Sequence, residues 1–296
     1  MEQRFTEFWD GVVSEVMALP EDVHVRPAPL YSDDKVAVSA LTFTGIGGAQ
    51  VACWMAKPRG EAIGSLVQFP AYANVLFPPV GYAEQGMVAL SVSVRGHHGT
   101  ELEGVGFPGL LVEGLPRADA YAYRGLYADA LQAVRLVSRL IAPGLPLVLM
   151  GQSQGAALAL FAAAQTGVPV GVAADVPFLC SIREAIKLTS AFPYRELSAF
   201  LRARPDESDE ALRTVDLFDA VAFAADVACP VLMSIGTLDP VTPLIATRAL
   251  ARALPDAEVI EYEGAGHEGG GMTHRLLQTR WMLDQIKKHA AMRIGR

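Results

Sequence analysis

Short apolar runs alternate with helical patterns along most of this 296-residue chain, and the alternation constrains its fold more than any other feature. Six runs are too short for helices, and most are bounded by glycine or proline: Gly64 to Phe69, Met87 to Val94, Pro146 to Met150, Val170 to Ala174, Pro230 to Ile235 and Glu258 to Tyr262. Helical patterns lie between several of them, at Tyr123 to Leu140, Gln154 to Gln165, Val241 to Leu254 and Thr273 to Lys288. This repeated alternation of strand and helix predicts an α/β fold, with a mostly parallel, twisted sheet that helices cover on both faces.

Three further segments depart from this alternation. Lys35 to Thr44 and Gln50 to Lys57 are rich in β-forming residues and are separated by Gly45-Ile46-Gly47-Gly48, which predicts an antiparallel hairpin. Thr100 to Arg117 shows neither the helical nor the strand periodicity of apolar residues. It is expected to be a long loop bordering a site. The segment 181–225 carries about three helical patterns and predicts a helical insertion that serves as a lid or an oligomer contact.

The composition supports one large folded unit. Apolar residues make up 51% of the chain and charged residues 19%, which excludes intrinsic disorder and allows a large core. Because α/β folds often reach this length as one unit, we expect a single domain over residues 1–296.

Charge and cysteine usage exclude several classes of partner. The net charge of −8 repels polyanions, so neither nucleic acid nor an anionic membrane surface is expected to bind. Cys53, Cys180 and Cys229 are far apart and favour buried core positions over a disulfide or a zinc cluster. The adjacent His97 and His98 do not form a metal site by themselves. The amino terminus lacks the order of a secretory signal, and the longest apolar run has nine residues, so we expect a cytoplasmic protein.

One pentapeptide places a reactive residue type at a strand-to-helix junction. Pro146 to Met150 leads into Gly151-Gln152-Ser153-Gln154-Gly155, which leads into a helical pattern. A G-x-S-x-G sequence in this context holds its serine on a strained turn, where the residues two before and two after must be small. Ser153 is therefore the candidate nucleophile, and the Gln154 N–H at the helix start is a candidate donor to an oxyanion. The alternative is a chance pentapeptide on an ordinary loop.

A serine hydroxyl needs a base to take its proton and an acid to orient that base. In this type of fold the order along the chain is serine, aspartate, histidine. Asp239 follows the strand Pro230 to Ile235, and His267 lies in a glycine-rich loop after the last predicted strand. Taken singly, Asp239 could be a helix cap and His267 a polar loop residue. Three residues of the right type, order and position favour a catalytic triad.

Five motifs give the chain a family resemblance that extends over nearly its whole length. They are Arg95-Gly96, the serine pentapeptide, Asp175-Val176-Pro177-Phe178-Leu179-Cys180, Phe192-Pro193-Tyr194 and His267-Glu268-Gly269-Gly270-Gly271. With them the sequence resembles the acetyl xylan esterase and cephalosporin C deacetylase family of α/β hydrolases, carbohydrate esterase family 7.

This resemblance implies a serine carboxylesterase that removes acetyl groups from small or oligomeric substrates, such as acetylated sugars or cephalosporin C. It carries over Ser153 as nucleophile, Asp239 as orienting acid and His267 as base. It also implies Tyr72 as the second oxyanion donor, because Pro70-Ala71-Tyr72 matches the family's His-Gly-Tyr. No metal or organic cofactor is implied. A homo-oligomer, in this family commonly a hexameric ring, is expected.

The sequence departs from the family at two loops beside the oxyanion donors. Pro70-Ala71 replaces His-Gly, and Arg95-Gly96-His97-His98 replaces Arg-Gly-Gln-Gly. Because glycine reaches backbone conformations that alanine reaches only with strain, we expect strain at Ala71 and an altered oxyanion hole. Two alternatives stay open at this point: another hydrolase on the same scaffold, either a peptidase or a longer-chain esterase, and a non-catalytic member that binds ligand in the cleft.

Overall fold

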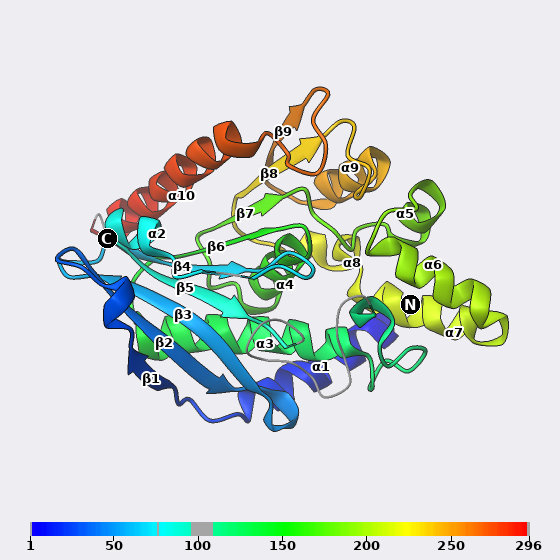
Figure 1. Cartoon of the computed structure of the whole chain (residues 1–296), viewed down its shortest axis with the longest axis horizontal. Coiled ribbons are helices and arrows are strands. Elements are labelled where there is room, and N and C mark those ends of the chain that lie inside the picture. The colour runs from blue at the N-terminus through cyan, green and yellow to red at the C-terminus, as the bar shows by residue number, and fades with distance from the viewer. Residues whose placement is uncertain (1, 76, 96–108, 295–296) are drawn as a thin grey trace.

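The computed structural model describes residues 2–75, 77–95 and 109–294, which contain a nine-stranded sheet (Figure 1). Its spatial order is β1-β2-β3-β5-β4-β6-β7-β8-β9. The strands are β1 (His24–Pro27), β2 (Val36–Thr44), β3 (Gln50–Pro58), β4 (Gly64–Phe69), β5 (Met87–Ser93), β6 (Leu147–Gln152), β7 (Gly171–Asp175), β8 (Val231–Gly236) and β9 (Ala257–Tyr262). All eight strands predicted from the sequence are present, within about two residues of their predicted bounds.

The sheet has an antiparallel and a parallel part. Strands β1, β2, β3 and β5 pair antiparallel, whereas β5, β4, β6, β7, β8 and β9 pair parallel. The predicted hairpin is β2 and β3, and its turn uses positive φ angles at Gly47 and Gly48. The predicted α/β architecture is therefore confirmed, with β1 as an additional edge strand.

Successive residues of the central strands enter different cores on the two faces of the sheet. Val67 and Leu149 pack into a large cluster that includes α3 (Ala122–Leu136) and α4 (Gln154–Thr166). Their neighbours Leu66 and Val148 pack instead against α10 (Gly271–Ile294), through its Met282 and Ile286. Figure 1 shows α3 and α10 on opposite sides of the strands. Burial on both faces explains why these strands read as continuous apolar runs.

The amino-terminal helix α1 (Glu2–Met17) was not among the predicted helices. Its Trp9 is buried and lies within 5.5 Å, between ring centroids, of Tyr127, Phe161 and Phe218. An aromatic cluster built from four distant segments anchors α1, so tertiary packing rather than a local motif fixes this helix.

Other helix bounds differ from the prediction at their ends. Helix α9 (Leu244–Ala253) begins three residues later than expected, because Pro243 is its N-cap. The α3 pattern ends in a π-helical turn, Val137–Ile141. Short helical elements include α2 (Val80–Glu84), which packs against β2, β3 and β5, and a 3-10 turn, Leu110–Val112. No helix within the described ranges combines the length and the apolar character that crossing a membrane requires.

The predicted insertion between β7 and β8 is helical. It contains α5 (Ile182–Leu188), α6 (Tyr194–Ala203), α7 (Ser208–Val215) and α8 (Ala220–Phe223). Asp219 accepts backbone hydrogen bonds from Ser181, Ile182 and Val221, and so joins the first helix of the insertion to the last.

The predicted loop from Thr100 to Arg117 lies outside the described residues over 100–108. The assignment of the chain to a single domain stays a prediction.

A buried ion pair ties the end of β5 to α3. Arg95 donates to Asp129 from Nη2 at 2.7 Å and from Nε at 3.0 Å, and the Asp129 side chain is fully buried. The Arg95 backbone N–H donates to the same carboxylate at 3.1 Å. Arg95 begins one of the motifs behind the family resemblance, so the motif is explained in part by this structural pair.

We predict that Asp129→Ala lowers the free energy of unfolding by about 3–5 kcal/mol, because it leaves the largely buried Arg95 guanidinium without its acid partner. Urea unfolding followed by circular dichroism measures the change. Asp119→Ala, which breaks the exposed pair with Arg117, is the matched control and should be indistinguishable from wild type. Equal effects of the two substitutions would contradict a stabilising role for the buried Arg95–Asp129 pair.

Candidate active site

Ser153 lies on a sharp turn between β6 and α4, as its pentapeptide predicts. Its φ of 55° and ψ of −116° are strained for a residue other than glycine. A Cβ at Gly151 would lie 2.1 Å from the Gly155 carbonyl carbon, and a Cβ at Gly155 would lie 2.2 Å from the Phe69 carbonyl oxygen. Both glycines are therefore required by close backbone approach, and the size argument made from the sequence is confirmed.

The segment after β7 holds this turn from the other side. The Ser153 N–H donates to the Asp175 carbonyl at 2.8 Å, and the Phe178 N–H donates to the Ser153 carbonyl at 3.1 Å. Phe178 is buried and its ring centroid lies 4.5 Å from that of Tyr194. The motif beginning at Asp175 and the motif ending at Tyr194 therefore meet in the core behind Ser153. Phe178 and Tyr194 thus support the serine turn from the core.

His267 and Asp239 are hydrogen-bonded to each other although 28 residues separate them. His267 Nδ1 lies 2.8 Å from Asp239 Oδ2, and the Asp239 side chain is buried. The carboxylate also accepts hydrogen bonds from the backbone N–H groups of Val241 and Thr242 and from the Thr242 hydroxyl. A carboxylate at Nδ1 favours the tautomer with its proton there, which leaves Nε2 as an acceptor.

The surroundings of Asp239 favour its charged form. Burial alone would raise the pKa of this carboxyl, but the hydrogen bonds from His267 and Thr242 outweigh burial and hold the pKa below its ordinary value. The stability that these bonds contribute is present above the unfolded-state pKa. It is lost as the pH falls through the lowered folded-state value.

Ser153 and His267 line the same cavity, which has a volume of about 500 Å³. We call it the serine cavity; its other walls come from residues 71–73, from Phe192, Pro193 and Glu196, and from Val241. Within the described part of the chain, neither the Ser153 hydroxyl nor His267 Nε2 has a hydrogen-bond partner. Both polar groups are thus available to a ligand in the cavity. Hydrogen bonds between catalytic groups often form only once substrate is bound.

The two residues predicted as oxyanion donors lie beside the turn. Gln154 is the first residue of α4, and Tyr72 lines the serine cavity. The Gln154 side chain accepts a hydrogen bond from the Tyr123 hydroxyl at 2.7 Å and donates to the Pro70 carbonyl at 3.4 Å. This contact holds the loop that carries Tyr72 against the start of α4.

The expected backbone strain at Ala71 is not present. Ala73 is the residue of this loop that adopts a positive φ, of 56°. The left-handed conformation of this loop thus lies two residues after Ala71. Because alanine bears a Cβ, the positive φ is strained at Ala73.

Glu196 is a residue of the site that the sequence did not indicate. It comes from α6, is 8% exposed, and accepts a hydrogen bond from the Tyr72 hydroxyl at 2.8 Å to either carboxylate oxygen. The Leu111 N–H donates to the same carboxylate at 3.2 Å. Burial, with the hydrogen bond to Glu196, raises the pKa of Tyr72 above its ordinary value. Glu196 follows the Phe192-Pro193-Tyr194 motif by two residues, and that proximity was the available signal.

In the ranges 2–75, 77–95 and 109–294, no group of three or more His, Cys, Asp or Glu residues is arranged to hold a metal ion. The three cysteines are buried and unbonded, as predicted for small core residues. His97 and His98 lie outside the described residues.

Comparison with known proteins identifies one family over nearly the whole chain. The family model for acetyl xylan esterase (AXE1) matches residues 1–285. A curated relative, the acetyl esterase Axe7A of Xylanibacter ruminicola, is 23% identical over 258 residues, which cover 81% of this chain. The matched region spans 57% of the length of that relative.

Solved structures show the same fold. An acetyl xylan esterase from Paenibacillus sp. R4 superposes with a TM-score of 0.87 at 26% identity, covering 95% of this chain and 94% of that one. Acetyl xylan esterase 1 from Thermoanaerobacterium sp. JW/SL YS485 superposes with a TM-score of 0.86 at 22% identity, covering 95% and 93%. The α/β-hydrolase fold expected from the resemblance is thus confirmed.

We predict that Glu196→Ala lowers kcat for p-nitrophenyl acetate by about tenfold, because the loop carrying Tyr72 loses the acceptor that holds it. Glu196→Gln keeps one acceptor for the Tyr72 hydroxyl and should recover most of the rate. Glu184→Ala, on the neighbouring helix α5, is the control with wild-type kinetics. An alanine variant that folds and turns over at the wild-type rate would remove Glu196 from this role.

Proposed function

This chain belongs to the acetyl xylan esterase (AXE1) family, and from that membership we propose that it is a serine esterase acting through an acyl-enzyme. Its substrates are short acyl esters, above all acetyl groups on small or oligomeric carbohydrates, with the acetyl ester of cephalosporin C as a further substrate. The observation that carries the proposal is the hydrogen-bonded His267–Asp239 pair in the cavity that also contains Ser153.

In the first half-reaction Ser153 Oγ attacks the ester carbonyl carbon while His267 Nε2 takes the hydroxyl proton. Asp239 fixes the imidazole ring and stabilises the imidazolium that forms. The N–H groups of Tyr72 and Gln154 donate to the oxyanion of the tetrahedral intermediate. When the intermediate collapses, the bond to the alcohol oxygen breaks, and the alcohol leaves with the proton from His267.

In the second half-reaction water attacks the acyl-enzyme. His267 takes a proton from the water, the same two N–H groups hold the second oxyanion, and the acid departs as Ser153 regains its proton. Each step uses only residues of this chain and water. The proposal therefore requires no metal or organic cofactor.

One part of the proposal concerns assembly. A homo-oligomer, with a hexamer as the specific form, is carried over from the family resemblance. The second candidate functions remain a longer-chain esterase, a peptidase on the same scaffold, and a non-catalytic ligand-binding member. The longer-chain esterase differs from the proposal in its acyl preference, and the peptidase differs in the bond that it cleaves. The non-catalytic member differs in having no turnover.

We predict that Ser153→Ala lowers kcat for p-nitrophenyl acetate by at least about a thousandfold, because no other group supplies the nucleophile. Circular dichroism and the urea midpoint should stay at wild-type values. Ser190→Ala removes an exposed hydroxyl of the insertion and serves as the control with full activity. Wild-type turnover by a folded Ser153→Ala protein would exclude the proposed mechanism.

We also predict a steep acyl-chain preference, with kcat/KM falling by about tenfold or more between p-nitrophenyl acetate and the butyrate. This preference is carried over from the family resemblance, because the serine cavity is lined mainly by apolar side chains and does not by itself reject an alkyl chain. A series of p-nitrophenyl esters from acetyl to octanoyl measures the effect. Equal or rising values along the series would favour the longer-chain esterase, and cleavage of p-nitroacetanilide would favour a peptidase.

A further inference from the structure

A second cavity, of about 680 Å³, lies on the other side of the loop that carries Tyr72. Ala71 lines both cavities, and Gln152, the residue before Ser153, lines the second one. Its volume lies within the ~300–1,000 Å³ of small-molecule sites. We call it the amide-lined cavity after its five amide side chains, which are Gln68, Asn74, Gln85, Gln152 and Gln278.

The cavity arises because one face of the sheet changes from apolar to polar along three neighbouring strands. On β4, Leu66 packs under α10 and Gln68 follows two residues later on the same face. On β7, Ala173 packs under α10 and Asp175 follows in the same way. Strand β6 adds Gln152 at its carboxyl end. Ligands of open α/β sheets bind at the carboxyl ends of the strands, where this polar surface lies.

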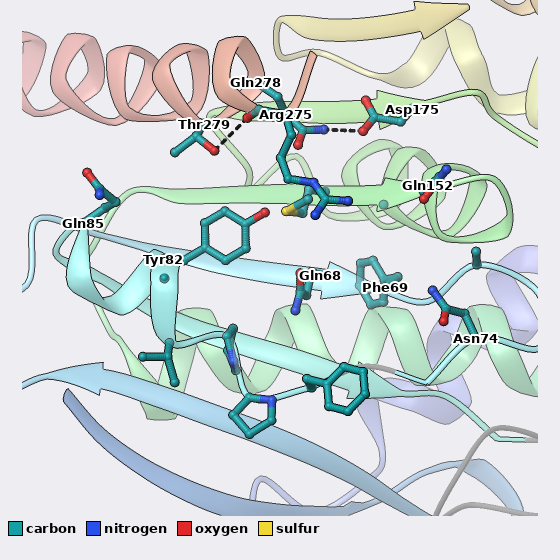
Figure 2. Close-up of a pocket in the computed structure, with 18 of the residues that line it drawn as sticks. Gln68, Phe69, Asn74, Tyr82, Gln85, Gln152, Asp175, Arg275, Gln278 and Thr279 are labelled. Atoms are coloured by element: carbon teal, nitrogen blue, oxygen red, sulfur yellow. Dashed lines mark hydrogen bonds between the residues drawn. The ribbon is translucent and has the colours of Figure 1, made fainter. Parts of the chain in front are cut away.

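Helices α2 and α10 form the two sides of the cavity. Figure 2 shows the Tyr82 ring directed inward from α2 and the Arg275 side chain directed inward from α10. Burial raises the pKa of Tyr82, whereas Arg275 lowers it, which agrees with their facing each other. The rim carries apolar side chains, with Phe77 75% exposed and Leu276 69% exposed. A flat aromatic ring at the mouth of a polar cavity suits the C–H face of a sugar ring.

The amide groups in the cavity are only partly used by the protein. Gln152 Nε2 donates to the His267 carbonyl at 3.2 Å, and Gln278 Nε2 donates to Asp175 at 2.7 Å. Within residues 2–75, 77–95 and 109–294, the amide oxygens of Gln68, Gln152 and Gln278 accept no hydrogen bond. In the same ranges the Arg275 guanidinium has no acceptor. The wall of the amide-lined cavity therefore offers both hydrogen-bond acceptors and hydrogen-bond donors to a ligand.

This mixture indicates a neutral polyhydroxyl ligand and disfavours an anion. A hydroxyl group both donates and accepts, so it pairs with an amide oxygen as well as with a guanidinium. An anion accepts only, and in this cavity it would face the Glu84 carboxylate and that of Asp175, which is hydrogen-bonded to His274 and Gln278. The chain's net charge of −8 adds to that repulsion.

We propose that the amide-lined cavity binds a neutral pyranose unit of an oligosaccharide. This inference rests on the proposed function, because the bound unit would belong to the carbohydrate whose acetyl group enters the serine cavity. Gln152 links the two cavities, since it lines the sugar site, precedes Ser153 and donates to the backbone of His267. When one sugar unit is bound there, the acetylated unit of the same oligosaccharide lies beside Ser153. The bound sugar unit does not enter the acyl pocket.

The direct test is calorimetric titration with xylotetraose, which has no ester and is not consumed. We expect Arg275→Ala and Phe77→Ala each to raise the Kd by about fivefold or more. Arg280→Ala, an exposed arginine on the same helix, and Leu30→Ala, an exposed leucine that does not line the cavity, should bind as wild type. Absent binding by the wild type, or equal binding by all variants, would overturn the proposal. Tighter binding of an oligogalacturonate of equal length would overturn it as well.

A kinetic comparison separates this inference from the esterase proposal. In Arg275→Ala, KM for acetylated xylo-oligosaccharides should rise while kcat and KM for p-nitrophenyl acetate stay unchanged. If the wild type hydrolyses neither ester, the proposed function fails, yet the titration still reports on the sugar site. If the variants change the molar mass in solution and leave xylotetraose binding unchanged, the face is a contact between copies and the sugar site is excluded.

Discussion

The site depends on the close approach of β6 to α4 at the serine turn. Gly151 and Gly155 meet backbone at distances that leave no room for a Cβ, and Ser153 accepts a strained conformation between them. Strain of this kind persists only where the surroundings over-determine it. Here the surroundings are the backbone hydrogen bonds from the segment after β7, together with the buried Phe178. The turn therefore presents its hydroxyl at the rim of the sheet.

Other parts of the site assemble around that turn from the same edge of the sheet. Asp239 follows β8 and His267 follows β9, so adjacent parallel strands bring them within hydrogen-bond distance. The insertion adds Glu196, which holds the Tyr72 loop from the opposite side. The strands therefore fix the half of the site that carries the His267–Asp239 pair, and the insertion supports the half that carries Tyr72.

The sequence predicts the strand and helix alternation well because each central strand is buried on both faces and is bounded by glycine or proline. The sequence also predicts that Ser153, Asp239 and His267 lie at one edge of the sheet, because each of them follows a parallel strand. Helix α1 was missed because its anchor, Trp9, packs on aromatic residues from distant segments. Glu196 and the amide-lined cavity were missed for a related reason. Their partners meet only in three dimensions, and an isolated glutamate or glutamine carries no local signal.

Covalent labelling tests most directly whether His267 activates the Ser153 hydroxyl. The protein is incubated with a fluorophosphonate, its intact mass is measured, and the modified residue is located by peptide mapping. The account predicts one adduct per chain, on Ser153, with loss of esterase activity in step with labelling. It also predicts that a His267→Ala variant, still folded, labels far more slowly. An unlabelled protein, or an adduct on another residue that accounts for the lost activity, would contradict it.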